Sequence, residues 1–85
     1  MKEFTYVITD EVGIHARPAG LLAQEAKKFT STVMFVKGEK SAKATSMMKI
    51  MGMGIVKGDE ITVTVEGDDE EAAAAAIEAF VKANL

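Results

Sequence analysis

The sequence predicts an α+β domain in which helices cover one side of a β-sheet. Two kinds of hydrophobic spacing lead to this prediction. Every second residue is apolar in residues 3–8 and 60–66, as in strands with one buried face, whereas residues 16–29 and the alanine-rich stretch after residue 70 have helical spacing. Strands and helices that follow one another in a short chain pack as two layers around a shared core. With 85 residues, 48% of them hydrophobic, we expect one domain over residues 1–85 with one modest core.

The first strand and the first helix are predicted from the N-terminal third. Phe4, Tyr6 and Ile8 share one face of the strand, and residues 10–13 form the turn that follows it. The helix is expected from Ala16 to Phe29. Its apolar residues keep helical spacing and predict one buried stripe: Ala19, Leu22, Ala23, Ala26 and Phe29.

A hairpin and a short helix are predicted in the middle of the chain. Residues 32–37 and 40–44 flank Gly38 and Glu39, which indicates two strands joined by a tight turn. Ser46 directly precedes an apolar cluster, so we expect it to be the N-cap of a short helix that ends near Gly52.

The clearest strand and the last helix come at the end. In residues 60–66, Ile61, Val63 and Val65 alternate with polar residues. The acidic run at 68–71 precedes a run of alanines, and acidic residues in a first turn complement the helix dipole. The run therefore predicts a helix start and no metal site. The buried face of this helix is expected to hold Ala73, Ile77, Phe80 and Val81.

Composition excludes several functional classes. Thirteen acidic and ten basic residues give a net charge of −3, which offers no support for binding nucleic acid or an anionic membrane. The chain has no cysteine and only one histidine, so a zinc site would lack ligands. No run approaches membrane-spanning length and the N-terminus has no apolar signal core, so we expect a cytoplasmic protein.

The stretch from Gly13 to Ala19, Gly-Ile-His-Ala-Arg-Pro-Ala, places the only histidine at the expected start of the first helix. Pro18 suits a first turn, where its missing N–H costs nothing. Unpaired N–H groups and the helix dipole favour an anion beside His15, and the guanidinium of Arg17 suits phosphate oxygens. These residues predict a phosphoryl-accepting site. The plainer alternative is a surface histidine without chemistry.

This string resembles the active-site signature of the HPr family, the histidine-containing phosphocarriers of the bacterial phosphoenolpyruvate-dependent sugar phosphotransferase system. The resemblance extends over essentially the whole chain. It implies an open-faced β-sandwich whose antiparallel four-stranded sheet, in the order 1-4-2-3, is covered on one face by three helices. It also implies a monomeric carrier that is no enzyme and needs no cofactor.

The resemblance assigns roles to the site residues. His15 would accept a phosphoryl group on Nδ1 from Enzyme I, whose own donor is phosphoenolpyruvate, and would pass the group to sugar-specific IIA components. Arg17 would stabilise the charge of the transferring group, and Ala16 and Pro18 would form the helix start.

A second resemblance concerns Ser46. The stretch from Ser46 to Gly52 is similar to that of HPr proteins from low-GC Gram-positive bacteria, in which an ATP-dependent HPr kinase/phosphorylase phosphorylates this serine. The phosphoserine form of those proteins accepts phosphate poorly from Enzyme I and is a corepressor for a catabolite-control transcription factor. The alternative for Ser46 is an ordinary helix cap. Thr45 replaces the lysine that is common before this serine.

The methionines near Ser46 have two possible roles, because methionine fills irregular gaps in cores and also suits adaptable docking surfaces. The resemblance implies an apolar surface beside the histidine that binds Enzyme I and IIA components. Our candidates are Gly20, Leu21, Met48 and Met51, with Met47 for the repressor contact and Lys27 and Lys49 as charges at the rim.

Two other functions remain as alternatives. One is a purely regulatory module that resembles the HPr-like repression protein, but such proteins lack the active histidine that this chain has in His15. The other is a ferredoxin-like domain that binds a small molecule or a metal. That layout has no use for a lone histidine at a helix start, and the chain lacks the cysteines of the usual metal loop.

Overall fold

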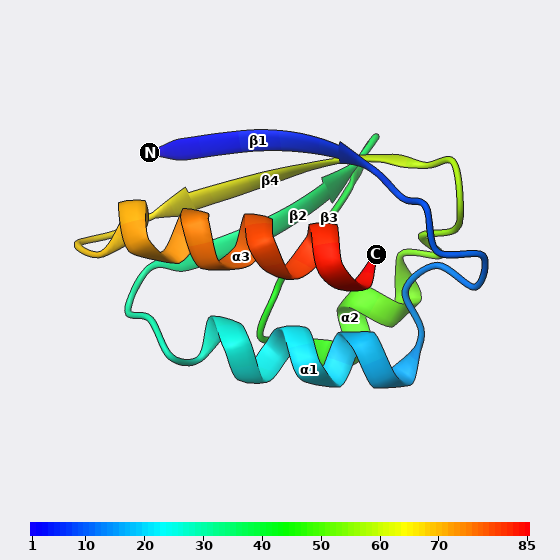
Figure 1. The fold of residues 1–85 in the computed structure, drawn as a ribbon, viewed down its shortest axis with the longest axis horizontal. Coiled ribbons are helices and arrows are strands. Elements are labelled where there is room, and N and C mark those ends of the chain that lie inside the picture. The colour runs from blue at the N-terminus through cyan, green and yellow to red at the C-terminus, as the bar shows by residue number, and fades with distance from the viewer.

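A computed structural model describes all residues from 1 to 85, and its sheet and helices form two layers (Figure 1). Four strands and three helices occur in the predicted order. They are β1 (Lys2–Val7), α1 (Ala16–Ala26), β2 (Thr32–Lys37), β3 (Lys40–Lys43), α2 (Met47–Gly52), β4 (Glu60–Glu66) and α3 (Glu70–Asn84).

The sheet is antiparallel throughout, with strand order β1-β4-β2-β3. At its centre, Val63 of β4 lies opposite Phe4 of β1 on one side and opposite Phe35 of β2 on the other. All three helices lie on the same side of the sheet, and the other side is open (Figure 1). The α+β class and the strand order 1-4-2-3 are therefore confirmed.

The core lies between the sheet and the helices. Ile61, Val63 and Val65 are fully buried, whereas the alternating Thr62 and Thr64 are only half-buried on the open face. The predicted stripe of the first helix and most of the predicted face of the last are buried against these strands, with Phe29 and Phe80 half-buried at the margin. Removing each large apolar side chain from water stabilises the fold by about 1.5–3 kcal/mol, so this layer supplies most of the driving force for folding.

The first helix is shorter than the sequence predicts, because α1 ends at Ala26 and not at Phe29. After Ala26 the backbone N–H of Lys28 donates to the carbonyl of Glu25, and that of Phe29 donates to Ala26. These i to i−3 bonds belong to a tighter turn than the α-helix. Phe29 still packs on the core from this turn, which is why its spacing looked helical.

The acidic run at residues 68–71 starts α3, as predicted, and also contacts the N-terminus and the loop between α1 and β2. Glu70 and Glu71 lie in the first helical turn, and the Glu70 carboxylate is 2.8 Å from the Met1 amino group. Asp69 does not cap its own helix. Its carboxylate accepts hydrogen bonds from the N–H groups of Thr30 and Ser31, both at 2.9 Å, and from the Ser31 hydroxyl. Asp69 thus ties the start of α3 to the α1–β2 loop.

We expect part of the acid sensitivity of the fold to come from Asp69. The Ser31 hydroxyl and then the Thr30 N–H hold the pKa of this carboxyl below its ordinary value of 3.8. Because the folded-state pKa is lowered, the stabilisation is complete above the ordinary value and is lost as the pH falls toward the folded-state pKa. Urea unfolding of Asp69→Asn should show a smaller loss of stability below about pH 4 than the wild type. An identical acid profile would show that these hydrogen bonds do not depend on the charge of Asp69.

Candidate functional site

The loop that carries His15 to the start of α1 is held on two sides. On one side, Ile8 accepts a backbone hydrogen bond from Gly58 at 2.8 Å, and Ile14 donates one to Ile55 at 3.1 Å. On the other side, the N–H groups of Thr9 and Asp10 donate to the backbone oxygen of Leu85 at 2.6 and 2.7 Å. The loop, the α2–β4 connection and the end of α3 therefore meet at one end of the molecule (Figure 1).

Gly13 is required at the point where this loop lies against the α2–β4 connection. Its φ of +77° is in the left-handed region that side chains disfavour. A Cβ at this position would lie 2.3 Å from the Ile55 carbonyl oxygen and 2.6 Å from the Val56 Cα. The sharp turn that the sequence predicts at Gly13 is confirmed, and the structure adds the close backbone approach.

His15 occupies the N-cap of α1 with an extended backbone, at φ −124° and ψ −169°. Its carbonyl accepts the N–H of Ala19 at 3.0 Å, while its side chain makes no capping hydrogen bond and is exposed. The N–H groups of Ala16 and Arg17 belong to the first turn, which has no intrahelical acceptors, and Pro18 has no N–H. The ring is therefore free beside unpaired donors.

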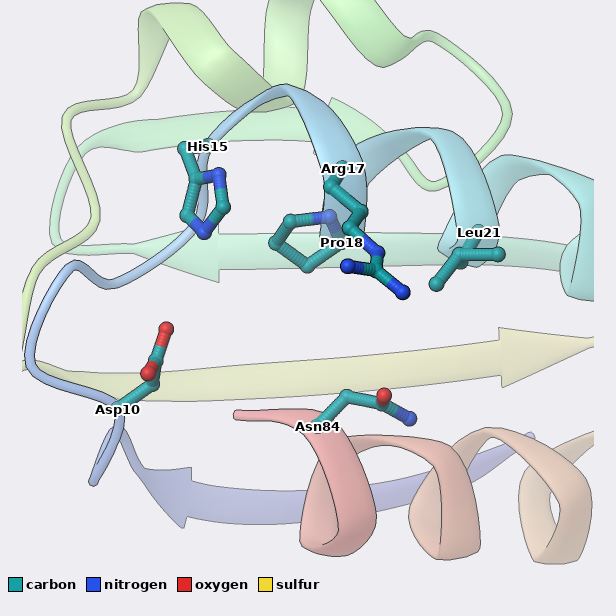
Figure 2. A pocket seen from close by; sticks show the side chains of 6 residues that line it. All are labelled: Asp10, His15, Arg17, Pro18, Leu21 and Asn84. Carbon is teal, nitrogen blue, oxygen red and sulfur yellow. The ribbon is translucent and has the colours of Figure 1, made fainter.

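His15 and Arg17 line one open pocket together with two further residues of α1 and with residues from two other places in the chain (Figure 2). The lining residues are Asp10, His15, Arg17, Pro18, Leu21 and Asn84. The sequence predicts Asp10 only as part of a turn and gives no role to Asn84, which comes from the end of α3. No local pattern marks either residue, because the fold brings them to His15 from outside the motif.

The pocket has the chemistry to bind and accept an anionic group. A neutral imidazole is a good nucleophile near pH 7, and its exposure leaves it open to a large partner. The Arg17 guanidinium supplies up to five donors in a planar fork. Helix-start N–H groups and the dipole of α1 add fixed positive potential at the same place.

Ser46 lies outside this pocket, at the N-cap of α2. Its predicted position as the cap is confirmed, since the Ile50 N–H donates to the Ser46 carbonyl at 3.0 Å. The hydroxyl, however, makes no capping hydrogen bond and is half-buried. The hydroxyl oxygen of Ser46 therefore takes no part in capping α2.

The apolar candidates for docking lie on α1 and α2, which pack against each other, and we call these five residues the α1–α2 patch: Gly20, Leu21, Met47, Met48 and Met51. The two helices touch at Gly20, where an added Cβ would lie 3.6 Å from the Met47 sulfur. Met48 is 76% exposed and Leu21 41%, whereas Met47 and Met51 are half-buried against the core and Met53 is buried. The charged candidates Lys27 and Lys49 are exposed. Met53 therefore belongs to the core, whereas Met48 is exposed and stays a candidate for docking.

Neither a membrane-spanning helix nor a metal-ligand cluster is present: no helix has the length and apolarity to span a bilayer, and no three histidine or acidic side chains are grouped as metal ligands.

The sequence and the structure are both similar to those of the same group of known proteins. Residues 2–83 match the family model described as the PTS HPr component phosphorylation site. The phosphocarrier protein HPr of Mycoplasma genitalium is 46% identical over 85 residues, which cover 99% of this chain and 97% of that protein.

Two solved structures from Thermoanaerobacter tengcongensis, each 41% identical, were also matched. The crystal structure of HPr-C-His superposes with a TM-score of 0.91 and covers 98% of this chain and 93% of that one. A crystal structure described as an HPr dimer superposes with a TM-score of 0.76, covering 98% and 95%. The chain belongs to the HPr family of phosphocarrier proteins of the phosphotransferase system.

Proposed function

We propose that His15 accepts a phosphoryl group from phosphorylated Enzyme I on Nδ1 and donates it to sugar-specific IIA components. The observation that carries this proposal is the exposed His15 at the N-terminus of an 11-residue helix, in one pocket with Arg17, in a member of the HPr family. Phosphoenolpyruvate is the ultimate donor, through Enzyme I.

The transfer is a substitution at phosphorus. The lone pair of the His15 nitrogen forms a bond to phosphorus while the bond to the donor breaks, and that electron pair stays with the donor. Arg17 and the N–H groups of the first turn face the oxygens on which negative charge is concentrated. Donation to a IIA component is the same step in reverse, so the site must bind the group without holding it too tightly.

The chain is a carrier and no enzyme under this proposal. It ends each half-reaction with a changed covalent state, and only a second protein restores it. The phosphoryl group is cargo, and we assign no cofactor or metal to the site. The exposure of His15 suits this role, because the ring has to enter two different partner active sites in turn.

Transfer through the isolated carrier tests the proposal. The chain is phosphorylated with phosphoenolpyruvate and Enzyme I, separated from both, and mixed with a IIA component. We expect the phosphoryl group to leave His15 and to appear on the IIA component in equal amount. Release as free phosphate, with none on the IIA component, would contradict the carrier function.

We further propose that Ser46 is a regulatory site for an ATP-dependent HPr kinase/phosphorylase and that the phosphoserine form binds a catabolite-control repressor. The free hydroxyl of Ser46 at the start of α2 favours this second role. A phosphate there adds about −1.5 to −2 of charge beside the α1–α2 patch and is expected to change partner binding more than the fold. Mass spectrometry after treatment with ATP and the kinase should show one phosphate on the wild type and none on Ser46→Ala. Equal labelling of both would assign the kinase site elsewhere.

Enzyme I and IIA components are proposed to bind the α1–α2 patch in turn, which requires that the carrier leave the patch open and act as a monomer. Met48 is the most exposed apolar residue of the patch, at 76%. We therefore expect Met48→Asp to weaken Enzyme I binding by about tenfold or more, since a central exposed contact is desolvated on binding, and to leave stability within about 0.5 kcal/mol. Titration calorimetry and urea unfolding measure the two effects.

Two control variants make the Met48 prediction specific. Met48→Leu keeps the apolar contact and should bind almost normally. Thr5→Asp adds the same charge at an exposed position of β1, away from the helices, and should bind like the wild type. Unfolding of Met48→Asp would instead place this side chain in the core.

A further inference from the structure

Asp10 lines the pocket with His15 and Arg17, and hydrogen bonds hold its backbone there. Its backbone N–H donates to the Leu85 oxygen at 2.7 Å, and its carbonyl accepts the N–H of Gly13 at 3.0 Å. The neighbouring Thr9 hydroxyl donates to the same Leu85 oxygen at 3.1 Å. These bonds fix the backbone on both sides of the carboxylate, so its place in the pocket follows from the fold.

The charge of Asp10 is not neutralised by a neighbour. The five ion pairs of the structure involve other carboxylates, and no side-chain hydrogen bond includes Asp10. In Figure 2 the carboxylate points from the loop toward the ring of His15, while the Arg17 guanidinium lies on the side of Leu21 and Asn84. A negative charge without an ion-pair partner therefore faces the residue that, under the proposed function, becomes negatively charged.

We infer that Asp10 raises the phosphoryl-donor strength of the carrier by destabilising the phosphorylated form of His15. The inference rests on the proposed function and concerns the equilibrium of phosphoryl transfer between His15 and its partner proteins. When phosphorus bonds to His15, the anionic oxygens enter a pocket that already holds the Asp10 carboxylate, and like charges repel across it. When the group leaves for a IIA component, this repulsion is released. Arg17 assists binding and transition-state charge, and Asp10 limits how tightly the product is held.

The equilibrium can be measured by direct competition. Wild-type chain labelled with nitrogen-15 and unlabelled Asp10→Asn are mixed in equal amounts with a trace of Enzyme I and a limiting amount of phosphoenolpyruvate. Intact mass at equilibrium gives the phosphorylated fraction of each. Enzyme I serves both proteins in the same tube, so the ratio depends only on the relative stability of the two phosphorylated forms. Glu11→Gln is the matched control, since Glu11 lies beside Asp10 and is exposed but does not line the pocket.

We expect Asp10→Asn to hold about two- to fivefold more phosphoryl group than the wild type near physiological salt, and the excess to shrink at about 1 M salt, where charges are screened. For Glu11→Gln, the ratio of its phosphorylated fraction to that of the wild type should be close to one. An Asp10→Asn ratio equal to that of Glu11→Gln, or a ratio below one, would overturn the inference while leaving the carrier function intact. Absence of phosphorylation on every variant, the wild type included, would instead remove the proposed function and the inference with it.

Discussion

Arg17→Ala is expected to slow phosphoryl transfer by about 10²–10³-fold, the usual cost of removing one charged or hydrogen-bonding group that stabilises a developing negative charge. Stability should change by less than about 0.5 kcal/mol, because Arg17 is exposed and makes no ion pair within 4.0 Å. The slower transfer would therefore come from a less stabilised transition state and not from a damaged fold. Rapid-quench kinetics of both half-reactions, together with urea unfolding, measure the two effects separately.

Arg17→Lys is the control for this prediction. Lysine keeps the charge and loses the planar fork that can contact two phosphoryl oxygens, so it should transfer at an intermediate rate. Normal rates in both directions for Arg17→Ala would contradict the role given to the guanidinium. A large loss of stability would instead show that Arg17 supports the start of α1.

Gly13→Ala should be the most destabilising single substitution in the site, with a cost of about 2–4 kcal/mol from backbone strain and steric overlap together. The added Cβ would meet the Ile55 carbonyl oxygen and the Val56 Cα, which are backbone atoms that cannot rotate away. The His15 loop and the α2–β4 connection would have to separate, so transfer should also slow. Urea unfolding measures the stability, and the Enzyme I assay measures the transfer rate.

Gly54→Ala distinguishes the two causes. Gly54 also has a positive φ, +67°, but an added Cβ there meets nothing within 4 Å. In Gly54→Ala the free energy of unfolding should fall only by the conformational cost of a positive φ, about 1–2 kcal/mol. If Gly13→Ala costs no more than Gly54→Ala, the close backbone contact does not support the His15 loop.

The elements of the fold were predictable because their signals are local. Alternation in residues 60–66 depends only on which face of one strand is buried, and the structure buries Ile61, Val63 and Val65 as expected. The pairing of β1 with β4 is not local, since paired residues are at least 53 positions apart in the sequence, and it came from the resemblance to HPr proteins and not from periodicity. The predicted end of α1 at Phe29 was wrong, because Phe29 packs on the core from a turn that follows the helix.

The site was predictable only as far as one continuous motif could describe it. Gly13, His15, Arg17 and Pro18 are neighbours in sequence, and the structure brings them together at the start of α1. Asp10 and Asn84 joined them through the folded arrangement of a loop and a distant helix end. The exposure of Met48 and the burial of Met53 were equally undecidable, because a six-residue helix is too short for spacing to define its faces.

The central claim is that His15 carries the phosphoryl group, and intact mass after incubation with phosphoenolpyruvate and Enzyme I tests it most directly. We expect one added phosphoryl group on the wild type, labile in acid and stable in alkali as a phosphohistidine should be, and none on His15→Ala. A wild type that stays unmodified, or an equal modification of His15→Ala, would contradict the account.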